Sequence, residues 1–464
     1  MRPGIDLAGK RVLVVGLART GVVTALFSAG YGAIVTATDE RPELAETAAK
    51  LGAAGVKIEL GGHNSDSFAN QDLIVVSPGV PAKLPALELA RARGIPVWSE
   101  IELAWRFLRG KLIAITGSNG KTTTTSLVAH ILQTASIPTL VGGNIGTPLL
   151  ALVENSMDTT VTVAEISSFQ LETIEKFRPE IGVLLNLTPD HLDRHVSFEE
   201  YALAKMRMFE NQIERDIAVL NADDPEITRR MPAQPHIFWF SRQKRVAAGA
   251  FLRDEQIFFR NEGSEVALAR REEIPLRGEH NVENVLAACA AAYLAGADPG
   301  AIASGIKTFK GVEHRLEFVA EIAGVRFYND SKATNVDAAV KAIEAFSGPL
   351  IVILGGKDKG SPYTPLRELL HDRARMAILM GAAAEKIAED LGDSVPLKNA
   401  GTLDRAVEIA MQNAQAGDTV LLAPACSSFD QFENFEQRGR TFKELVANLE
   451  NQNQSAAGAS AQKG

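Results

Sequence analysis

The residues best suited to chemistry lie in a glycine-containing loop at residues 117–122, with the sequence GSNGKT. An apolar stretch at 111–116 precedes this loop, and a segment favourable to helix begins near Thr123. Backbone N–H groups in such a loop can bind phosphate oxygens, and the dipole of the following helix adds a favourable field. Lys121 is expected to contact the terminal phosphates of ATP, and the Thr122 hydroxyl is expected to ligate Mg²⁺.

The loop departs from the standard phosphate-binding pattern at one position. Ile115 stands where the standard loop has its first glycine, so the spacing is Gly-x-x-Gly-Lys-Thr. The alternative is a chance Gly-Lys-Thr at a helix cap. The strand–turn–helix context that the motif requires is present, and it favours a phosphate loop.

Two further side chains follow apolar stretches and are candidates for a metal site. Glu165 closes the stretch 160–164, and His191 follows the stretch 181–187. A single loop histidine is more often structural than catalytic. Carboxyl ends of parallel strands, however, meet at the edge of the sheet where α/β proteins bind ligands, and Mg²⁺ prefers oxygen ligands. The phosphate loop, Glu165 and His191 are therefore predicted to converge.

A second glycine-containing turn lies near the N-terminus. Residues 16–21 (GLARTG) approximate the dinucleotide fingerprint, and Asp39 stands about where a ribose-binding acid belongs. Ala18 replaces the second glycine, which weakens the interpretation as an NAD site. The turn supports a nucleotide-like anion at this domain, and Asp39 is either its ribose ligand or a solvated acid at a strand end.

The elements that position these residues alternate between buried strands and helices, which predicts an α/β protein of three domains. We expect a Rossmann-like domain at 1–98, with strands at 11–15 and 73–76 and one ending at Asp39. A central P-loop ATPase-type domain is expected at 99–311, and its residues 236–274 are expected to form an antiparallel stretch added to the sheet. A C-terminal Rossmann-like domain with a parallel sheet is expected at 312–450. The polar tail at 451–464 is expected to be disordered.

Composition narrows the function classes. The 464 residues carry a formal net charge of −9, which argues against a general nucleic-acid binder. The two cysteines, Cys289 and Cys426, indicate no disulfide framework and suggest a reducing compartment. No signal-peptide core and no stretch of about 18 apolar residues is present. We expect a cytoplasmic monomer that does not insert into membranes.

Several ordered motifs together resemble the Mur ligases, which join amino acids to the peptidoglycan precursor. The similarity covers residues 8–450 and includes the motifs TGSNGKTT at 116–123, GNIG at 143–146, EISSFQLE at 165–172, DHLD at 190–193, HNVEN at 280–284, EHR at 313–315, NDSKATN at 329–335 and LAPACSSFDQF at 422–432. The short first domain and the segment NFEQRG at 434–439 are similar to members that add D-glutamate to UDP-N-acetylmuramoyl-L-alanine.

The resemblance implies a role for particular residues. The ATP-binding residues are Gly117, Ser118, Asn119, Gly120, Lys121, Thr122, Thr123, Asn281, Asn284, Arg315 and Asp330. The metal ligands are Thr122, Glu165, His191 and a carbamylated Lys205, and the catalytic residues are Lys121, His191 and Lys205. The UDP-substrate residues are Thr20, Asp39, Arg41, Ser77, Gly79 and Asn144. The D-glutamate residues are Lys332, Thr334, Lys359, Ser428 and Phe435.

Two positions depart from the family pattern. The loop at 355–359 has the sequence GGKDK, so either Lys357 or Lys359 binds the D-glutamate carboxylate. Glu40 replaces a smaller polar residue beside Asp39, which leaves the uridine contacts open.

The implied reaction has two steps, and each needs a different kind of assistance. A substrate carboxylate attacks the γ-phosphate of ATP to form an acyl phosphate, and an amine then attacks its carbonyl carbon. Either His191 or a phosphate oxygen is the base that takes the proton from the amine. Closure of the third domain is expected to exclude water.

Three other hypotheses make different predictions. A folylpolyglutamate-synthase-like ligase has two domains and no UDP-binding domain, so residues 8–98 argue against it. A nucleotide-binding regulator predicts ATP binding without turnover that depends on an amino acid. A dehydrogenase predicts NAD binding at 16–21.

Overall fold

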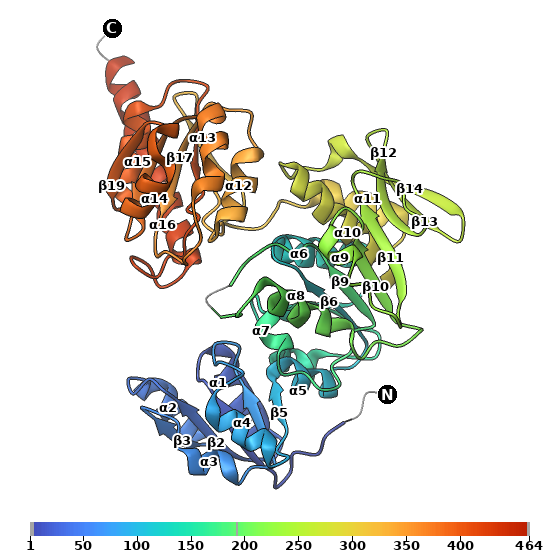
Figure 1. Ribbon diagram of the computed structural model, residues 1–464. Coiled ribbons are helices and arrows are strands. Elements are labelled where there is room, and N and C mark those ends of the chain that lie inside the picture. Colours follow the sequence, from blue (N-terminus) through green and yellow to red (C-terminus); the bar gives the residue numbers. More distant parts are fainter. Residues whose placement is uncertain (1–3, 192–193, 462–464) are drawn as a thin grey trace. The chain divides into compact units, whose positions relative to one another are not determined.

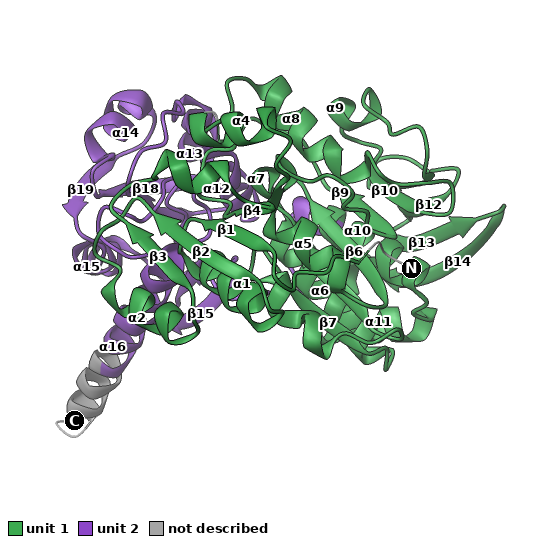
Figure 2. Ribbon diagram, turned by 90° about the horizontal axis from the view of Figure 1, so that it is seen from below, with its two compact units in different colours: residues 1–273, 283–309 green, residues 274–282, 310–464 purple. Residues whose placement is uncertain are grey.

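The computed structural model describes residues 4–191 and 194–461, and the chain divides into two compact units (Figure 2). Unit 1 comprises residues 1–273 and 283–309, and unit 2 comprises residues 274–282 and 310–464. Unit 1 contains two sheets and unit 2 contains one (Figure 1). The α/β class with three sheet-containing parts is as predicted, and the first two predicted domains lie together in unit 1.

The first sheet of unit 1 has five parallel strands in the order β3-β2-β1-β4-β5. Its strands are β1 Arg11–Val15, β2 Ile34–Asp39, β3 Lys57–Leu60, β4 Leu73–Val76 and β5 Val97–Ser99. Its helices are α1 Arg19–Gly30, α2 Ala45–Ala53, α3 Ser65–Ala69 and α4 Pro85–Ala92. Because β1 lies between β2 and β4, the residues that follow these three strands meet at one edge.

The second sheet has nine strands in the order β14-β13-β12-β11-β10-β9-β6-β8-β7. They are β6 Lys111–Thr116, β7 Thr139–Gly143, β8 Val161–Glu165, β9 Ile181–Leu184, β10 Ile217–Asn221, β11 His236–Ser241, β12 Gly249–Arg253, β13 Gln256–Asn261 and β14 Ser264–Arg270. The helices are α5 Glu100–Phe107, α6 Lys121–Thr134, η1 Leu149–Asn155, α7 Ser168–Leu171, α8 Phe198–Met206, η2 Arg207–Phe209, α9 Pro225–Thr228, η3 Arg271–Glu273, α10 Glu279–Ala295 and α11 Pro299–Thr308.

The order of these strands brings the predicted site together. Strand β6, which leads into the phosphate loop, lies between β9 and β8, and β7 pairs with β8 on its other side. All four strands are parallel. The loop, Glu165 at the end of β8 and the segment after β9 therefore share one edge.

The prediction of an antiparallel stretch at 236–274 is wrong for its first half. Strand β11 pairs in parallel with β10, and β12 pairs in parallel with β11; β13 pairs antiparallel with both β12 and β14. Alternating apolar residues show which face of a strand is buried, and this pattern is the same for both directions. The direction of β11 and β12 depends instead on the path of the loops that connect β10, β11 and β12.

Unit 2 contains a six-stranded sheet in the order β15-β16-β20-β17-β18-β19. Its strands are β15 Glu317–Ile322, β16 Val325–Asn329, β17 Leu350–Gly355, β18 Ala374–Met380, β19 Leu397–Gly401 and β20 Thr419–Leu422. Its helices are α12 Val336–Glu344, η4 Thr364–Leu366, α13 Arg367–Arg373, α14 Ala384–Leu391, η5 Gly392–Ser394, α15 Leu403–Asn413 and α16 Phe435–Ala461. The sheet is parallel as predicted, except that β15 is an antiparallel edge strand.

The last helix, α16, ends at Ala461. The expected disorder of the tail at 451–464 stays a prediction, and residues 462–464 lie outside the described residues.

Helix α5 explains why the first two sheets belong to one unit. Every residue from Glu100 to Arg106 is buried. The apolar side chains Ile101, Leu103 and Trp105 belong to a hydrophobic cluster that also includes residues of β1 and β6. The two sheets therefore share one core. Among the helices that the structure describes, none combines the length and the apolarity needed to cross a membrane.

Candidate active site

The loop at 117–122 has the backbone that its glycines allow. Gly117 has φ 154° and Gly120 has φ 84°, a region that other residues rarely adopt. A Cβ atom on Gly120 would lie 2.1 Å from Asn284 Oδ1, so this position also has no room for a side chain. The amine of Lys121 donates hydrogen bonds to the carbonyl oxygens of Gly117 (2.9 Å) and Ser118 (2.8 Å). The lysine thus folds back over the loop.

Side chains on the segments after β9 and on α8 fix the shape of the loop. The Asn119 N–H donates to Asn186 Oδ1 at 2.8 Å, and Asn186 Nδ2 donates back to the Asn119 carbonyl at 3.1 Å. The Ser118 hydroxyl donates to the Thr188 carbonyl at 2.8 Å and accepts from the Tyr201 hydroxyl at 3.0 Å. The loop is therefore anchored through Ser118 and Asn119.

Glu165 lies between two residues that the sequence assigned to different ligands. The Thr122 hydroxyl donates to Glu165 Oε2 at 2.7 Å, and Asn144 Nδ2 donates to Glu165 Oε1 at 2.8 Å. Glu165 is 2 % exposed. The structure thus brings the expected metal ligands Thr122 and Glu165 into contact, with Asn144 of the expected UDP-substrate set beside them.

Lys205, on α8, is a buried lysine with 2 % exposure. Burial lowers the pKa of its ammonium far below the usual range, and the charge of Lys121 lowers this pKa further. The carboxylates of Asp190 and Glu165 oppose that shift in the pKa. Lys205 Nζ lies 4.6 Å from the centre of the Tyr201 ring. The charges of Lys121 and of the acid at the end of β8 therefore act on Lys205.

His191 lies in the segment after β9 and has a left-handed backbone, with φ 54°. Its side chain is 35 % exposed, and its Nε2 lies 3.7 Å from Asp190 Oδ2. Its ring meets that of Phe169 edge-on, with centroids 4.9 Å apart. Leu192 and Asp193, which belong to the same motif, lie outside the described residues.

The donor set at Glu165 and Thr122 fits Mg²⁺. No group of three or more His, Cys, Asp or Glu side chains that could hold a metal ion occurs in the described ranges. Mg²⁺ bound to a nucleotide needs no such cluster, because it keeps waters and is bound by one or two carboxylates together with phosphate oxygens. A buried carboxylate 2.7 Å from a hydroxyl at the start of α6 meets that need.

The first sheet has a cavity of about 520 Å³ at its carboxyl edge. All six residues expected to bind the UDP-substrate line it: Thr20, Asp39, Arg41, Ser77, Gly79 and Asn144. Sequence reasoning missed three further residues that line the cavity, His63, Val80 and Pro81. None of them belongs to a recognisable motif, so only the fold brings them to the cavity.

Asp39, which lines this cavity, is held by several hydrogen bonds. Its carboxylate accepts two hydrogen bonds from the Arg41 side chain, each 2.9 Å, and one from the Leu17 N–H at 2.6 Å. The hydrogen bonds from the Arg41 guanidinium hold the pKa of Asp39 well below its usual range. Asp39 is 6 % exposed, so it is not the solvated strand-end acid that the sequence left open. A Cβ atom on Gly21 would lie 1.8 Å from the Gly16 carbonyl oxygen, which requires glycine there.

The remaining expected nucleotide residues lie in both units. Asn284, in unit 1, accepts a hydrogen bond from the Thr124 hydroxyl at 3.4 Å. In unit 2, Arg315 lies 3.7 Å from the buried Asp330, and burial raises the pKa of that acid to about 6. Asn281 Nδ2 donates to the Arg277 carbonyl at 2.6 Å.

Part of the expected D-glutamate set is brought together in unit 2. Lys332 Nζ lies 5.1 Å from the centre of the Phe435 ring. Ser428 is buried, whereas Thr334 and Lys359 are half-buried and Lys357 is exposed. The Lys357 N–H donates to the Ser427 carbonyl at 2.9 Å, which ties the loop after β17 to the segment that carries Ser428.

Arg438, on α16, was missed as a functional candidate. It is fully buried, and its guanidinium donates to the Ser331 hydroxyl at 2.9 Å, the Ser331 carbonyl at 2.8 Å and the Cys426 carbonyl at 3.2 Å. It therefore joins the segments that carry Lys332 and Ser428. The only signal in the sequence was its place in the 434–439 motif.

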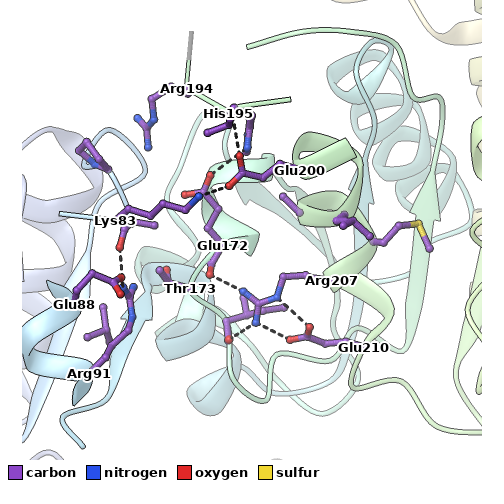
Figure 3. Close-up of a pocket in the computed structure, with 18 residues that line it drawn as sticks. Lys83, Glu88, Arg91, Glu172, Thr173, Arg194, His195, Glu200, Arg207 and Glu210 are labelled. Carbon is purple, nitrogen blue, oxygen red and sulfur yellow. Dashed lines mark hydrogen bonds and ion pairs between the residues drawn. The ribbon is translucent and has the colours of Figure 1, made fainter. Parts of the chain in front are cut away.

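A second cavity in unit 1, of about 810 Å³, lies outside the predicted site (Figure 3). Its lining includes His195 and Glu172, whose Nδ1 and Oε1 atoms lie 3.6 Å apart. Burial lowers the pKa of His195 and raises the pKa of Glu172, so each tends toward its neutral form. Lys83, from the first-sheet side, forms an ion pair with Glu200 on α8.

Known proteins match this chain along nearly its whole length. Family models match in three stretches: "Mur ligase MurD-like, N-terminal domain" at residues 10–99, "Mur ligase middle domain" at 115–292 and "Mur ligase, glutamate ligase domain" at 314–426. A UDP-N-acetylmuramoylalanine–D-glutamate ligase of Koribacter versatilis is 53 % identical over 97 % of this chain and 99 % of its own. The protein of the same name from Acidobacterium capsulatum is 56 % identical over 95 % of this chain and 97 % of its own.

Solved structures share the fold at low identity. A pseudomurein peptide ligase type C from Methanothermus fervidus aligns with a TM-score of 0.60 at 20 % identity, covering 95 % of this chain and 100 % of its own. The UDP-N-acetylmuramate-alanine ligase of Thermotoga maritima aligns with a TM-score of 0.59 at 20 % identity, covering 95 % and 99 %.

Proposed function

Because this chain belongs to the Mur ligase family, we propose that it is the ligase that adds D-glutamate to UDP-N-acetylmuramoyl-L-alanine, with ATP converted to ADP and phosphate. The observation that carries the proposal is the identity of 53 % and 56 % to two curated relatives named for this activity, over nearly the full length of each chain. The reaction belongs to the cytoplasmic synthesis of the peptidoglycan precursor.

ATP is bound through the loop at 117–122 in this proposal. The N-terminus of α6 and the loop N–H groups face the phosphates, and Lys121 leaves the carbonyls of Gly117 and Ser118 to contact them. The substrate carboxylate and the γ-phosphate are both anions, so the ammonium of Lys121 offsets the repulsion between them. The adenosine side involves Asn281, Asn284, Arg315 and Asp330.

Thr122 and Glu165 hold Mg²⁺ in this proposal, and the contact between them supports it. Bound there, the metal neutralises charge that develops on the phosphate oxygens. A second ion is held by His191 together with Lys205. The distance of 3.7 Å from His191 Nε2 to Asp190 Oδ2 supports an oriented imidazole.

Lys205 serves as a metal ligand only after carbamylation, which converts its amine into a carboxylate. A neutral amine is needed to attack CO₂, and the burial of Lys205 favours that form. The nearby positive charge of Lys121 then favours the anionic carbamate. The first step follows from the burial of Lys205 and the second from the charge of Lys121.

The two remaining substrates bind to different units in the proposal. UDP occupies the cavity lined by Thr20, Asp39 and the turn at 77–79. D-Glutamate is held in unit 2 by Lys332, Thr334, Lys359, Ser428 and Phe435. The amine of D-glutamate attacks the acyl phosphate and forms the amide as phosphate leaves.

The test is phosphate release from ATP and Mg²⁺ with UDP-N-acetylmuramoyl-L-alanine, using a panel of amino acids. We expect D-glutamate to stimulate release and L-glutamate, glycine and diaminopimelate to give little. Stimulation by another amino acid alone would refute the assignment within the family. ATP binding with no stimulated turnover would favour the nucleotide-binding regulator.

A further inference from the structure

Arg194 contacts the turn that lines the UDP cavity. Its Nη1 donates to the Gly79 carbonyl at 3.0 Å, and its Nη2 donates to the carbonyls of Pro78 (3.3 Å) and Val80 (3.1 Å). All three of these residues line the cavity at the edge of the first sheet. One guanidinium from the segment after β9 therefore holds the backbone of a turn more than 100 residues away, because its planar fork can donate in several directions.

The same side chain also contacts the segment that follows Glu165. The guanidinium carbon of Arg194 lies 4.3 Å from the centre of the Phe169 ring, a stacking distance for arginine on an aromatic face. Phe169 also meets the rings of His191 and His195, at 4.9 Å and 5.5 Å. The Arg194 N–H donates to the His191 carbonyl at 3.0 Å, so the backbone of the two residues is joined as well.

A second contact runs parallel to the first. Lys83, four residues beyond Gly79, forms an ion pair with Glu200 on α8, the helix that carries Lys205 (Figure 3). Arg194 and Glu200 thus contact the 78–83 segment from positions that lie between His191 and Lys205 in the sequence. A movement of the 78–80 turn would be transmitted to that region through packed groups.

From this arrangement we infer that Arg194 is a positioning residue that couples occupation of the UDP cavity to the geometry of His191 and the ATP–metal site. The inference rests on the proposed function. Substrate that orders the 78–80 turn orders Arg194, and Arg194 in turn holds Phe169 and the His191 backbone. By reciprocity, nucleotide bound at the metal site tightens the binding of the UDP-substrate.

The experiment measures the dissociation constant of UDP-N-acetylmuramoyl-L-alanine on the full-length protein, with and without a non-hydrolysable ATP analogue and Mg²⁺. For the unchanged protein we expect the analogue to tighten binding about tenfold, a common size for coupling between sites. In Arg194→Gln the ratio should fall toward one. Its KM for the UDP-substrate should rise, while its KM for D-glutamate stays within about twofold.

Two variants make the result specific. Arg194→Lys keeps the charge but lacks the fork, so it should fold and still lose most of the ratio. Arg109→Gln is the matched control, because Arg109 makes an exposed pair with Asp158 elsewhere in unit 1; it should keep the ratio. An unchanged ratio in both Arg194 variants, a ratio of one in the original protein, or a fall in kcat alone would overturn the inference. Failure of the proposed function is seen separately, as an absence of glutamate-stimulated phosphate release.

Discussion

At the scale of single residues, the candidate centre depends on side chains whose properties differ from those of their free forms. Lys205 is buried, which lowers the pKa of its ammonium, and Glu165 is enclosed by Thr122 and Asn144. Gly120 is required twice, once for its left-handed backbone and once for the space taken by Asn284. The properties of Lys205 and Gly120 each lead to a test by substitution.

We expect Lys205→Ala to lower kcat by about 100-fold or more, the range seen when a group that stabilises developing charge is removed. Small carboxylic acids added to this variant should restore part of the activity, because they can replace the lost carbamate. The assay is glutamate-stimulated phosphate release. Lys111→Ala, at the exposed first residue of β6, is the control and should keep its activity. Full activity of Lys205→Ala would refute the metal role.

Gly120→Ala should raise the KM for ATP by at least tenfold, because the added Cβ atom would have to displace Asn284 from the phosphate loop. Gly55→Ala provides the comparison, since Gly55 also has a positive φ of 78° but has no atom within 4 Å of an added Cβ. Both variants should lose about 1 kcal/mol of unfolding free energy through backbone strain. Only the Gly120 variant should change ATP kinetics; equal KM values would contradict the prediction.

At the scale of elements, α5 holds the two sheets of unit 1 together. Glu102 is fully buried, and its Oε2 accepts hydrogen bonds from the N–H groups of Glu175, Lys176 and Phe177. Its Oε1 forms an ion pair with Arg106 one turn later, at 2.7 Å. One carboxylate therefore accepts three backbone N–H groups of the segment after α7 and also pairs with a buried arginine. The cavity at the first sheet and the loop at 117–122 are therefore joined through this helix.

We expect Glu102→Gln to lower the free energy of unfolding by about 3 kcal/mol, because Arg106 would keep a buried charge without its partner. Glu88→Gln is the comparison, because Glu88 pairs with Arg91 on another helix but is 57 % exposed. This variant should lose less than about 1 kcal/mol of unfolding free energy. Urea denaturation followed by tryptophan fluorescence measures both. Similar midpoints for the two variants would show that the Glu102 cluster contributes little.

At the scale of the whole molecule, the hydrophobic clusters divide the chain differently from the domains predicted by the sequence motifs. The sequence predicted a first domain at 1–98, but α5 begins at Glu100 and shares its hydrophobic cluster with β1. Unit 2, in contrast, has hydrophobic clusters of its own on both faces of its sheet. The third predicted domain begins at 312, close to the change of unit at 310.

We therefore expect a fragment of residues 310–464 to unfold cooperatively on heating, because it contains its complete sheet. A fragment of residues 1–98 should show no cooperative transition, since it lacks the side chains of α5 that cover its core. Extending that fragment to 1–110 should improve its solubility. Circular dichroism against temperature distinguishes these outcomes, and a cooperative transition in the 1–98 fragment would refute the role given to α5.

The sequence by itself determined the features that depend on local chemistry. The glycines of the phosphate loop, the acid at the end of β8 and the buried strands follow from spacing and residue type over a few positions, and the structure agrees with them. The resemblance of the ordered motifs also indicated the family, because each motif keeps its own local pattern. The residues expected to bind UDP share a cavity for a related reason: parallel strands bring their carboxyl ends to one edge.

Only the tertiary structure decided which distant groups meet. Arg194, His63 and Arg438 belong to no pattern that assigns them a partner, and their contacts depend on the order of strands and the placement of α5 and α16. The direction of β11 and β12 was also beyond the sequence, because alternating burial is the same in parallel and antiparallel strands. The lowered pKa of Lys205 also depends on its burial in the folded protein. The same lysine on a solvent-exposed helix would be an ordinary ammonium.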